Sequence, residues 1–286
     1  MWLFWVLFIL TIILIIFVFI LVYQLGRRHF FSRIFGRSIK TDLYQRIEVR
    51  EWFNRTENLH GVFSVSLYKN CSVNLDIWRE RYYDPLLKSI QSVQQTLPGW
   101  QYRVYLDPSL EQTYRDELIN KGAQVGIMKY GNFDNSGSVW RFLSAADSPN
   151  FLCVDADDNP FQTFQIDQIN KWLESSHRFI LVPLYLVNLL VPISAGSWGG
   201  RAHSIPDIAE RLSRYNHGWF GADEAFLTRE IWPLVKQLGY YRTNQRGAVY
   251  LLLFGLSLAL ILLISLSVYC WSKQRGSRNI LMRKIK

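Results

Sequence analysis

The sequence predicts an α/β domain with a mostly parallel central sheet and helices on both faces, attached at each end to a membrane-spanning helix. Between residues 62 and 154, strand and helix patterns follow each other in the order β-α-β-α-β-α-β, which builds a parallel sheet with right-handed crossovers. Two apolar segments without a charged side chain, residues 2 to 23 and 247 to 272, enclose this region. About 205 residues lie between the basic cluster that follows the first segment and the start of the second segment, enough for one domain with a full core.

The two apolar segments are each long enough to cross a bilayer. At about 1.5 Å per residue, a helix of this length covers a hydrocarbon core of about 30 Å. Aromatic side chains typical of the membrane interface lie near their ends: Trp2, Trp5, Tyr23, Tyr250, Tyr269 and Trp271. A cleavable signal peptide is the alternative for the first segment, but no basic region precedes it and no A-x-A-like site follows it. We expect a two-pass integral membrane protein in contact with the lipid bilayer.

The positive charge of the chain is concentrated beside these segments. Five basic residues follow the first (Arg27, Arg28, Arg33, Arg37, Lys40) and six follow the second (Lys273, Arg275, Arg278, Arg283, Lys284, Lys286). Removing these eleven charges from the net charge of +9 leaves −2 for residues 41 to 246. The central domain therefore lacks the basic face of a nucleic-acid binder, and we expect no nucleic-acid partner.

The charge pattern leaves the side of the membrane open. The first basic cluster favours a cytosolic domain, whereas the second favours a domain in the lumen of the endoplasmic reticulum or Golgi. The sequons at Asn54 and Asn70 would report a lumenal domain if they were glycosylated. The expected organisation is a first span over 1–24, a basic collar and linker over 25–60, the α/β domain over 61–240, a second span over 247–272 and a basic tail over 273–286.

The first half of the domain shows clear periodicity. It predicts, in order, strand Val62–Leu67, helix Tyr82–Leu97, strand Tyr102–Leu106, helix Leu110–Lys121 and strand Ala123–Met128. Pro98-Gly99 and Gly122 mark where the two helices end.

The second half is more varied. It predicts a loop at Gly131–Ser138, helix Val139–Ala146, strand Phe151–Val154, helix Gln165–Ser175, two short strands or a hairpin over Arg178–Leu190, a flexible loop at Ser194–Arg201, helix Ile205–Tyr215, and a helix that starts with Asp223 and Glu224 and runs to Val235.

Strand Phe151–Val154 runs directly into Asp155-Ala-Asp157. Side chains two apart on an extended chain share a face, so both carboxylates are expected at the rim of the sheet. Paired carboxylates suit Mn²⁺ or Mg²⁺, with the remaining ligands supplied by water and substrate phosphates. The alternative is an acidic turn that caps the next helix. Tyr68 and Asp107 are expected at the same edge, because ligands of such sheets lie at the carboxyl ends of strands.

Six motifs in a fixed order give the sequence a family resemblance. They are Phe63-Ser-Val-Ser-Leu-Tyr68, Pro98-Gly-Trp-Gln-Tyr-Arg-Val-Tyr105, Trp140-Arg-Phe-Leu143, Asp155-Ala-Asp157, Ser197-Trp-Gly-Gly-Arg201, and Gly221-Ala-Asp-Glu-Ala-Phe-Leu227 with Ile231-Trp-Pro233. Over residues 62 to 236, the chain resembles the GT-A-like nucleotide-diphospho-sugar transferases, in particular poorly characterised viral and microbial members.

The resemblance implies a GT-A fold and a metal-dependent glycosyltransferase that uses a UDP- or GDP-sugar. It places Ser66, Leu67, Tyr68, Arg141 and Asp155 at the nucleotide-sugar. It implies a divalent metal at Asp155 and Asp157, a general base at Asp223 or Glu224, and sugar or acceptor contacts at Trp198, Gly199 and Gly200. Simpler explanations are a surface ion pair for Arg141, helix-dipole stabilisation for the Asp223-Glu224 pair, and core packing for Trp198.

The acceptor, whether a sugar, a protein or a lipid-linked molecule, stays open. Relatives often have a polar, His-containing segment where this chain has the apolar residues 184–191, which leaves room for an apolar acceptor near the bilayer or for lost activity. One rival function is a non-catalytic membrane protein that keeps the GT-A scaffold. Another is a haloacid-dehalogenase-type phosphohydrolase, in which Thr or Val stands where this chain has Asn159 and the Asp-x-Asp belongs to the first strand.

Overall fold

The structure is a computed structural model that describes residues 47–57, 59–69, 74–110, 112–132, 136–183, 191–215, 217 and 221–243. Both predicted spans, the basic collar and the basic tail lie outside these residues, as does most of the predicted second strand of the Arg178–Leu190 hairpin. None of the helices in the described ranges is long and apolar enough to cross a membrane.

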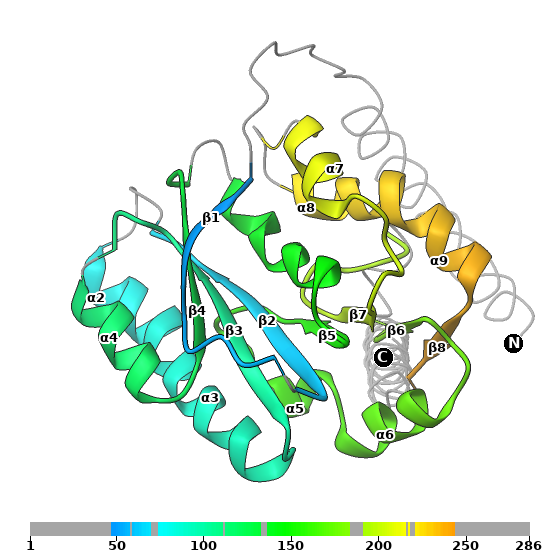
Figure 1. The fold of residues 1–286 in the computed structure, drawn as a ribbon, viewed down its shortest axis with the longest axis horizontal. Helices are drawn as coiled ribbons and strands as arrows, with labels where there is room; N and C mark the ends of the chain where they lie inside the picture. The colour runs from blue at the N-terminus through cyan, green and yellow to red at the C-terminus, as the bar shows by residue number, and fades with distance from the viewer. Residues whose placement is uncertain are drawn as a thin grey trace, which may run out of the picture. The chain divides into compact units, whose positions relative to one another are not determined.

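A mixed eight-stranded sheet forms the centre of the described domain (Figure 1). Its strands, in spatial order, are β1 Val49–Phe53, β4 Gln124–Met128, β3 Trp100–Leu106, β2 Gly61–Leu67, β5 Asn150–Cys153, β7 Trp198–Arg201, β6 Phe179–Leu181 and β8 Tyr240–Arg242. Only β1 and β7 are antiparallel to their neighbours, so the other six strands share one direction. The predicted α/β class with a mostly parallel sheet is confirmed.

Helices cover both faces of the sheet (Figure 1). The first layer is α2 Leu75–Trp78, η1 Arg79–Tyr83, α3 Asp84–Thr96, α4 Gln112–Asn120, α5 Pro160–Thr163 and α6 Ile166–Glu174. The second is η2 Ser136–Ala146, α7 Ile208–Arg214, α8 Ala222–Phe226, η4 Leu227–Ile231 and α9 Trp232–Leu238. Strands β2, β3 and β4 are therefore buried on two sides, which explains their near-continuous apolar runs.

Two of the predicted loops are wrong in part. The Ser194–Arg201 segment ends in β7, which pairs with β5 on one side and β6 on the other. Its Trp-Gly-Gly-Arg sequence does not indicate a strand, because the two glycines have no side chains and so give no alternation of apolar and polar residues. Ser136, Gly137 and Ser138 belong to the 3-10 helix η2 rather than to a loop.

The sheet extends beyond the predicted domain limits at both edges. Strand β1 lies within the segment assigned to the linker, where it pairs with β4 through Trp52 and Gly126. Strand β8 lies at the opposite edge and pairs in parallel with β6. Both are short edge strands whose pairing partners are distant in sequence, so local periodicity does not reveal them.

The order of the strands reverses at one position. Strand β2 comes first among the parallel strands, β3 and β4 follow on one side of it, and β5 lies on its other side. The direction of winding therefore reverses between β2 and β5. In open α/β sheets, ligands bind outside the carboxyl ends of the two strands at such a reversal.

Close packing of β7 against β5 gives a stability prediction. A Cβ atom added at Gly199 would lie 2.2 Å from the backbone oxygen of Phe151, so Gly199→Ala requires the two strands to separate. We expect a loss of about 1–3 kcal/mol, seen as a fall of several degrees in the midpoint of thermal unfolding. Gly131→Ala is the control, since its nearest neighbour would be 3.4 Å away. An unchanged midpoint for Gly199→Ala would show that β7 is not packed as described.

Candidate functional site

The strand reversal brings the predicted site residues onto one face of the sheet. Alternation along β2 places Ser64, Ser66 and Tyr68 on the side covered by η2, and alternation along β5 places Cys153 and then Asp155 on that side. Leu67 points to the opposite face, where it is buried in the other core cluster. Its side chain therefore cannot line this site, which corrects the expectation for Leu67.

Two serines of β2 fix the position of η2. The Ser66 hydroxyl accepts a hydrogen bond from the Arg141 backbone N–H at 2.9 Å, and the Ser64 hydroxyl donates one to the Arg141 carbonyl at 2.6 Å. Ser66 is buried by this contact, so its hydroxyl positions Arg141 rather than facing a ligand directly.

The Arg141 guanidinium is the centre of the site. It donates to the Val154 carbonyl at 3.0 Å, pairs with Asp155, and lies 3.4 Å from the Asp223 carboxylate. The side chain is only 6% exposed, so a surface ion pair does not describe it. Burial disfavours the charged form, but the carboxylates of Asp155 and Asp223 outweigh this and raise the pKa of Arg141. A permanent positive charge is therefore held between β5 and α8, and its Nε has no partner among the described residues.

Asp223 and Glu224 form an unequal pair of acids in the first turn of α8, as predicted. The Glu224 backbone N–H donates to the Asp223 carboxylate at 3.1 Å. Burial, a hydrogen bond between the two side chains and the charge of Asp223 raise the pKa of Glu224 to about 8. Asp223 forms the ion pair with Arg141, and Glu224 is the acid whose pKa is raised. The helix dipole explains their place on α8 but not this difference between them.

The acidic turn after β5 accumulates negative charge. Asp157 lies 3.3 Å from Arg81 of η1, and the backbone N–H of Asp158 donates to the Asp155 carbonyl at 3.2 Å. Burial and the charges of Asp155 and Asp157 raise the pKa of Asp158 to about 6. The next helix, α5, is capped by the Asn159 side chain at 3.0 Å from the Phe161 N–H. Helix capping therefore does not explain Asp155 or Asp157.

Asp155 and Asp157 are the two carboxylates expected to hold a divalent metal. Within the described ranges, no cluster of three or more His, Cys, Asp or Glu side chains is arranged to hold a metal. Mg²⁺ is often bound through one or two protein carboxylates, with water and phosphate oxygens completing its shell. Asp155, whose side chain is 47% exposed, and Asp157 would supply that pair, and the excess negative charge felt by Asp158 suits a bound cation.

Tyr68 directly follows β2 at the strand reversal. Its ring lies edge-on to Trp140 with centroids 6.0 Å apart, and its carbonyl accepts a hydrogen bond from the Trp78 indole at 2.8 Å. Burial raises the pKa of its hydroxyl, against the opposing effect of the Arg141 charge. Tyr68 therefore stays neutral and offers a fixed aromatic edge beside the cation.

The predicted acceptor residues lie elsewhere. Trp198 is fully buried, with its ring edge-on to Phe142 and Phe151 at 5.4 Å and 5.3 Å. It packs in the core, so the expectation that it stacks on a sugar is not compatible with this placement. Gly199 and Gly200 are buried in β7, where they allow close approach to β5 and β6.

Two residues at the site were not expected from the sequence. Arg81 reaches Asp157 from a helix whose amphipathic pattern gives no sign of that partner. Gly196 lies directly against Asp155, because an added Cβ would be 2.1 Å from its Oδ2 atom. In the sequence, the one feature that indicated a close contact at Gly196 was its place among the small residues Ser194-Ala-Gly-Ser197. Asp107, predicted at this edge, accepts bonds from the Ser109 hydroxyl and the Asn132 N–H, and so organises loops.

Comparison with known proteins gives no family assignment: no protein-family model matches the chain, and neither does any curated protein.

The buried ion pair can be measured by a double-mutant cycle. We expect Arg141→Met and Asp155→Asn to be coupled by about 0.5–3 kcal/mol in the free energy of unfolding, because each charge is partly deprived of water. The exposed pair Asp167–Lys171 on α6, at 3.4 Å, is the control and should couple by no more than about 0.5 kcal/mol. Equal coupling energies in the two cycles would contradict a buried Arg141.

Proposed function

We propose that the chain is a glycosyltransferase of GT-A type, which transfers a sugar from a nucleotide-diphosphate sugar with a divalent metal at the diphosphate. The observation that supports it best is the convergence of Tyr68, Arg141, Asp155 and Asp223 from four different elements at the strand reversal. A buried cation, exposed acidic ligands and an acid of raised pKa are the groups that such a transfer requires.

The donor half of the site would be formed by β2, η2 and the turn after β5. Asp155 and Asp157 would hold Mn²⁺ or Mg²⁺, which, when bound, neutralises charge that develops on the departing nucleoside diphosphate. Tyr68 would contact the nucleoside through its aromatic edge. Arg141 would hold Asp155 in place and add a fixed positive charge near the diphosphate.

The acceptor half of the site would be served by α8. Of its two acids, Asp223 is committed to Arg141, so Glu224 is the candidate base that takes a proton from an acceptor hydroxyl. Burial of Glu224 raises its basicity toward that needed near neutral pH.

Residues 2 to 23 and 247 to 272 complete the proposal at the level of sequence. We infer that they anchor the domain in a bilayer as a two-pass protein, on either its cytosolic or its lumenal side. A non-catalytic scaffold is the rival function, and donor turnover distinguishes the two.

Substitution at Asp157 tests the metal site. Asp157→Asn should lower Mn²⁺-dependent hydrolysis of a UDP- or GDP-sugar by at least about a hundredfold, because the amide is a poor ligand for a hard cation. The fold should persist, since the exposed pair with Arg81 contributes at most about 1 kcal/mol. Asp167→Asn, on the exposed surface of α6, is the control and should keep the parent rate. Parent-like turnover by Asp157→Asn would exclude this metal site.

The raised pKa of Glu224 predicts a pH dependence. Below that pKa the carboxyl is protonated and cannot accept a proton, so the transfer rate should rise with pH, by roughly tenfold between pH 7 and 9. Glu224→Gln should lose this rise together with about 10² to 10⁴ of the rate. Initial rates measured from pH 5 to 9 provide the test. A variant that retained the same pH profile would assign the base elsewhere.

A further inference from the structure

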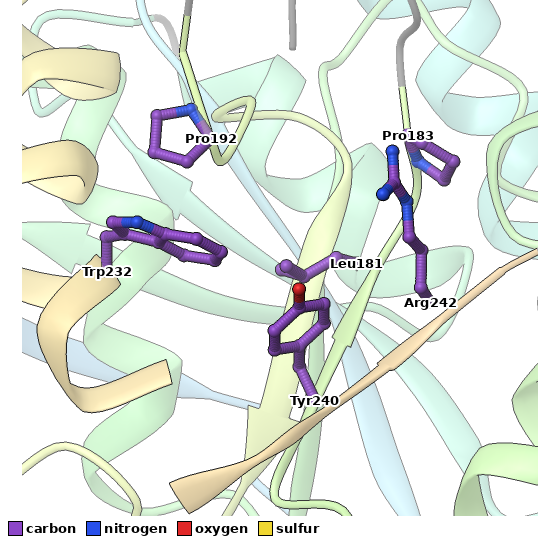
Figure 2. Close-up of a pocket in the computed structure, with 6 residues that line it drawn as sticks. All are labelled: Leu181, Pro183, Pro192, Trp232, Tyr240 and Arg242. Carbon is purple, nitrogen blue, oxygen red and sulfur yellow. The ribbon is translucent and has the colours of Figure 1, made fainter. Parts of the chain in front are cut away.

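A second pocket lies at the end of the sheet where β6 and β8 pair (Figure 2). Its volume is about 200 Å³, and its described lining consists of Leu181, Pro183, Pro192, Trp232, Tyr240 and Arg242. The donor half of the site contributes none of these residues. The pocket therefore requires an explanation of its own.

The lining combines the guanidinium of Arg242 with apolar and aromatic walls. Tyr240 and Arg242 are two apart on β8 and so share a face, and the ring of Trp232 lies 5.6 Å from that of Tyr240. Arg242 is exposed and makes no ion pair within the part of the chain that the structure describes. The segments that continue from the pocket in sequence, 184–190 and 244–250, contain no Asp or Glu. An anionic ligand is the natural partner of this guanidinium.

The pocket shares an edge of the sheet with Asp155. Cys153, Trp198, Leu181 and Arg242 are paired in turn across β5, β7, β6 and β8, so they form one row. At about 4.8 Å per strand, Arg242 lies about 14 Å along the row from Cys153. Since β8, β6 and β5 run in the same direction, their carboxyl ends meet at one edge. A ligand in the pocket therefore lies at the same carboxyl edge of the sheet where the donor would bind.

The pocket is close in sequence to the expected second span. Arg242 precedes the uncharged segment 247–272 by only five residues, which span at most about 18 Å. Trp, Tyr and Arg side chains are typical of the zone where a bilayer meets water. A volume of about 200 Å³ is below the roughly 300–1,000 Å³ of pockets that enclose a whole small molecule, so it suits one part of a larger ligand.

We propose that this pocket binds the phosphate of a membrane phospholipid and that this lipid, through a hydroxyl of its head group, is the acceptor. The phosphate pairs with Arg242, while Trp232, Tyr240 and the two prolines pack against the glycerol and the first carbons of the chains. The acceptor role, though not the binding, rests on the proposed function.

The transfer step follows from the same geometry. The head-group hydroxyl oxygen forms a bond to the anomeric carbon of the donor sugar, and the bond between that carbon and the diphosphate oxygen breaks. The bonding electrons leave with the nucleoside diphosphate, and the hydroxyl proton passes to the Glu224 carboxylate. No oxidant or reductant is needed.

Binding can be tested without catalysis. The full chain in detergent is titrated by calorimetry with dihexanoyl phosphatidylglycerol, with dihexanoylglycerol, which lacks the phosphate, and with inorganic phosphate, which lacks the lipid. We expect the phospholipid to bind at least tenfold more tightly than either control. Arg242→Gln should weaken its binding at least tenfold, because a charge-assisted contact is lost. Arg242→Lys should recover part of it.

Arg178→Gln is the matched control. Arg178 precedes β6, at the other end of the same strand pair, and its exposed side chain makes no hydrogen bond or ion pair among the described residues. We expect its affinity to stay within twofold of the parent. Three results would each overturn the lipid site. Arg242→Gln could bind the phospholipid as tightly as the parent, Arg178→Gln could lose as much affinity as Arg242→Gln, or inorganic phosphate could bind as tightly as the phospholipid.

The acceptor role has a separate outcome. Labelled sugar should appear in the phosphatidylglycerol head group, with a raised KM for the lipid in Arg242→Gln. If the parent hydrolysed donor and bound lipid but never transferred sugar to it, the acceptor role would be wrong and the proposed function would stand. If the parent did not turn over any donor, the proposed function would fail. The lipid-binding role of the pocket would then be tested by the calorimetry alone.

Discussion

The site depends on one buried positive charge. A guanidinium that is almost fully enclosed needs compensation, because an unpaired charge away from water costs several kcal/mol. Arg141 receives it from the turn after β5 and from α8, while the serines of β2 hold its backbone. These contacts join four elements, and the longest single contact, between Arg141 and Asp223, spans 82 residues of sequence. The placement of Asp155 and the pairing of Asp223 follow from this cation, and burial together with the neighbouring Asp223 raises the pKa of Glu224.

Much of the sheet was predictable because its inner strands are local patterns. β2, β3 and β4 are buried on both faces, and glycine or proline follows the helices between them, so each was placed to within about two residues. The strands that were missed or mistaken depend on distant partners. β7 contains two glycines and is recognisable only through its pairing with β5 and β6, and β1 depends on an edge of β4.

Part of the site was predictable because some of its residues stand in short sequence patterns that indicate their chemistry. Asp155-Ala-Asp157 follows a buried strand, and the Asp223-Glu224 pair begins a helix, so both were placed correctly. The partnership of Arg141 with both acids was not visible, because no spacing connects residues 141, 155 and 223. The family resemblance implies a sugar contact for Trp198, whereas here the neighbouring glycines allow close packing of strands around a core indole.

The antiparallel direction of β7 connects the two halves of the carboxyl edge. Because β7 runs against its neighbours, the chain enters it from that edge, and residues 191–197 pass from the pocket at Pro192 to the carboxylate of Asp155. Gly196 packs against that carboxylate, and the Ser197 carbonyl accepts a hydrogen bond from the Val182 backbone N–H beside Leu181 at 3.0 Å. A parallel strand in this place would begin at the opposite edge and leave Asp155 without this neighbour. The reversed strand is thus what lets a single short segment border the acidic turn and the Arg242 pocket together.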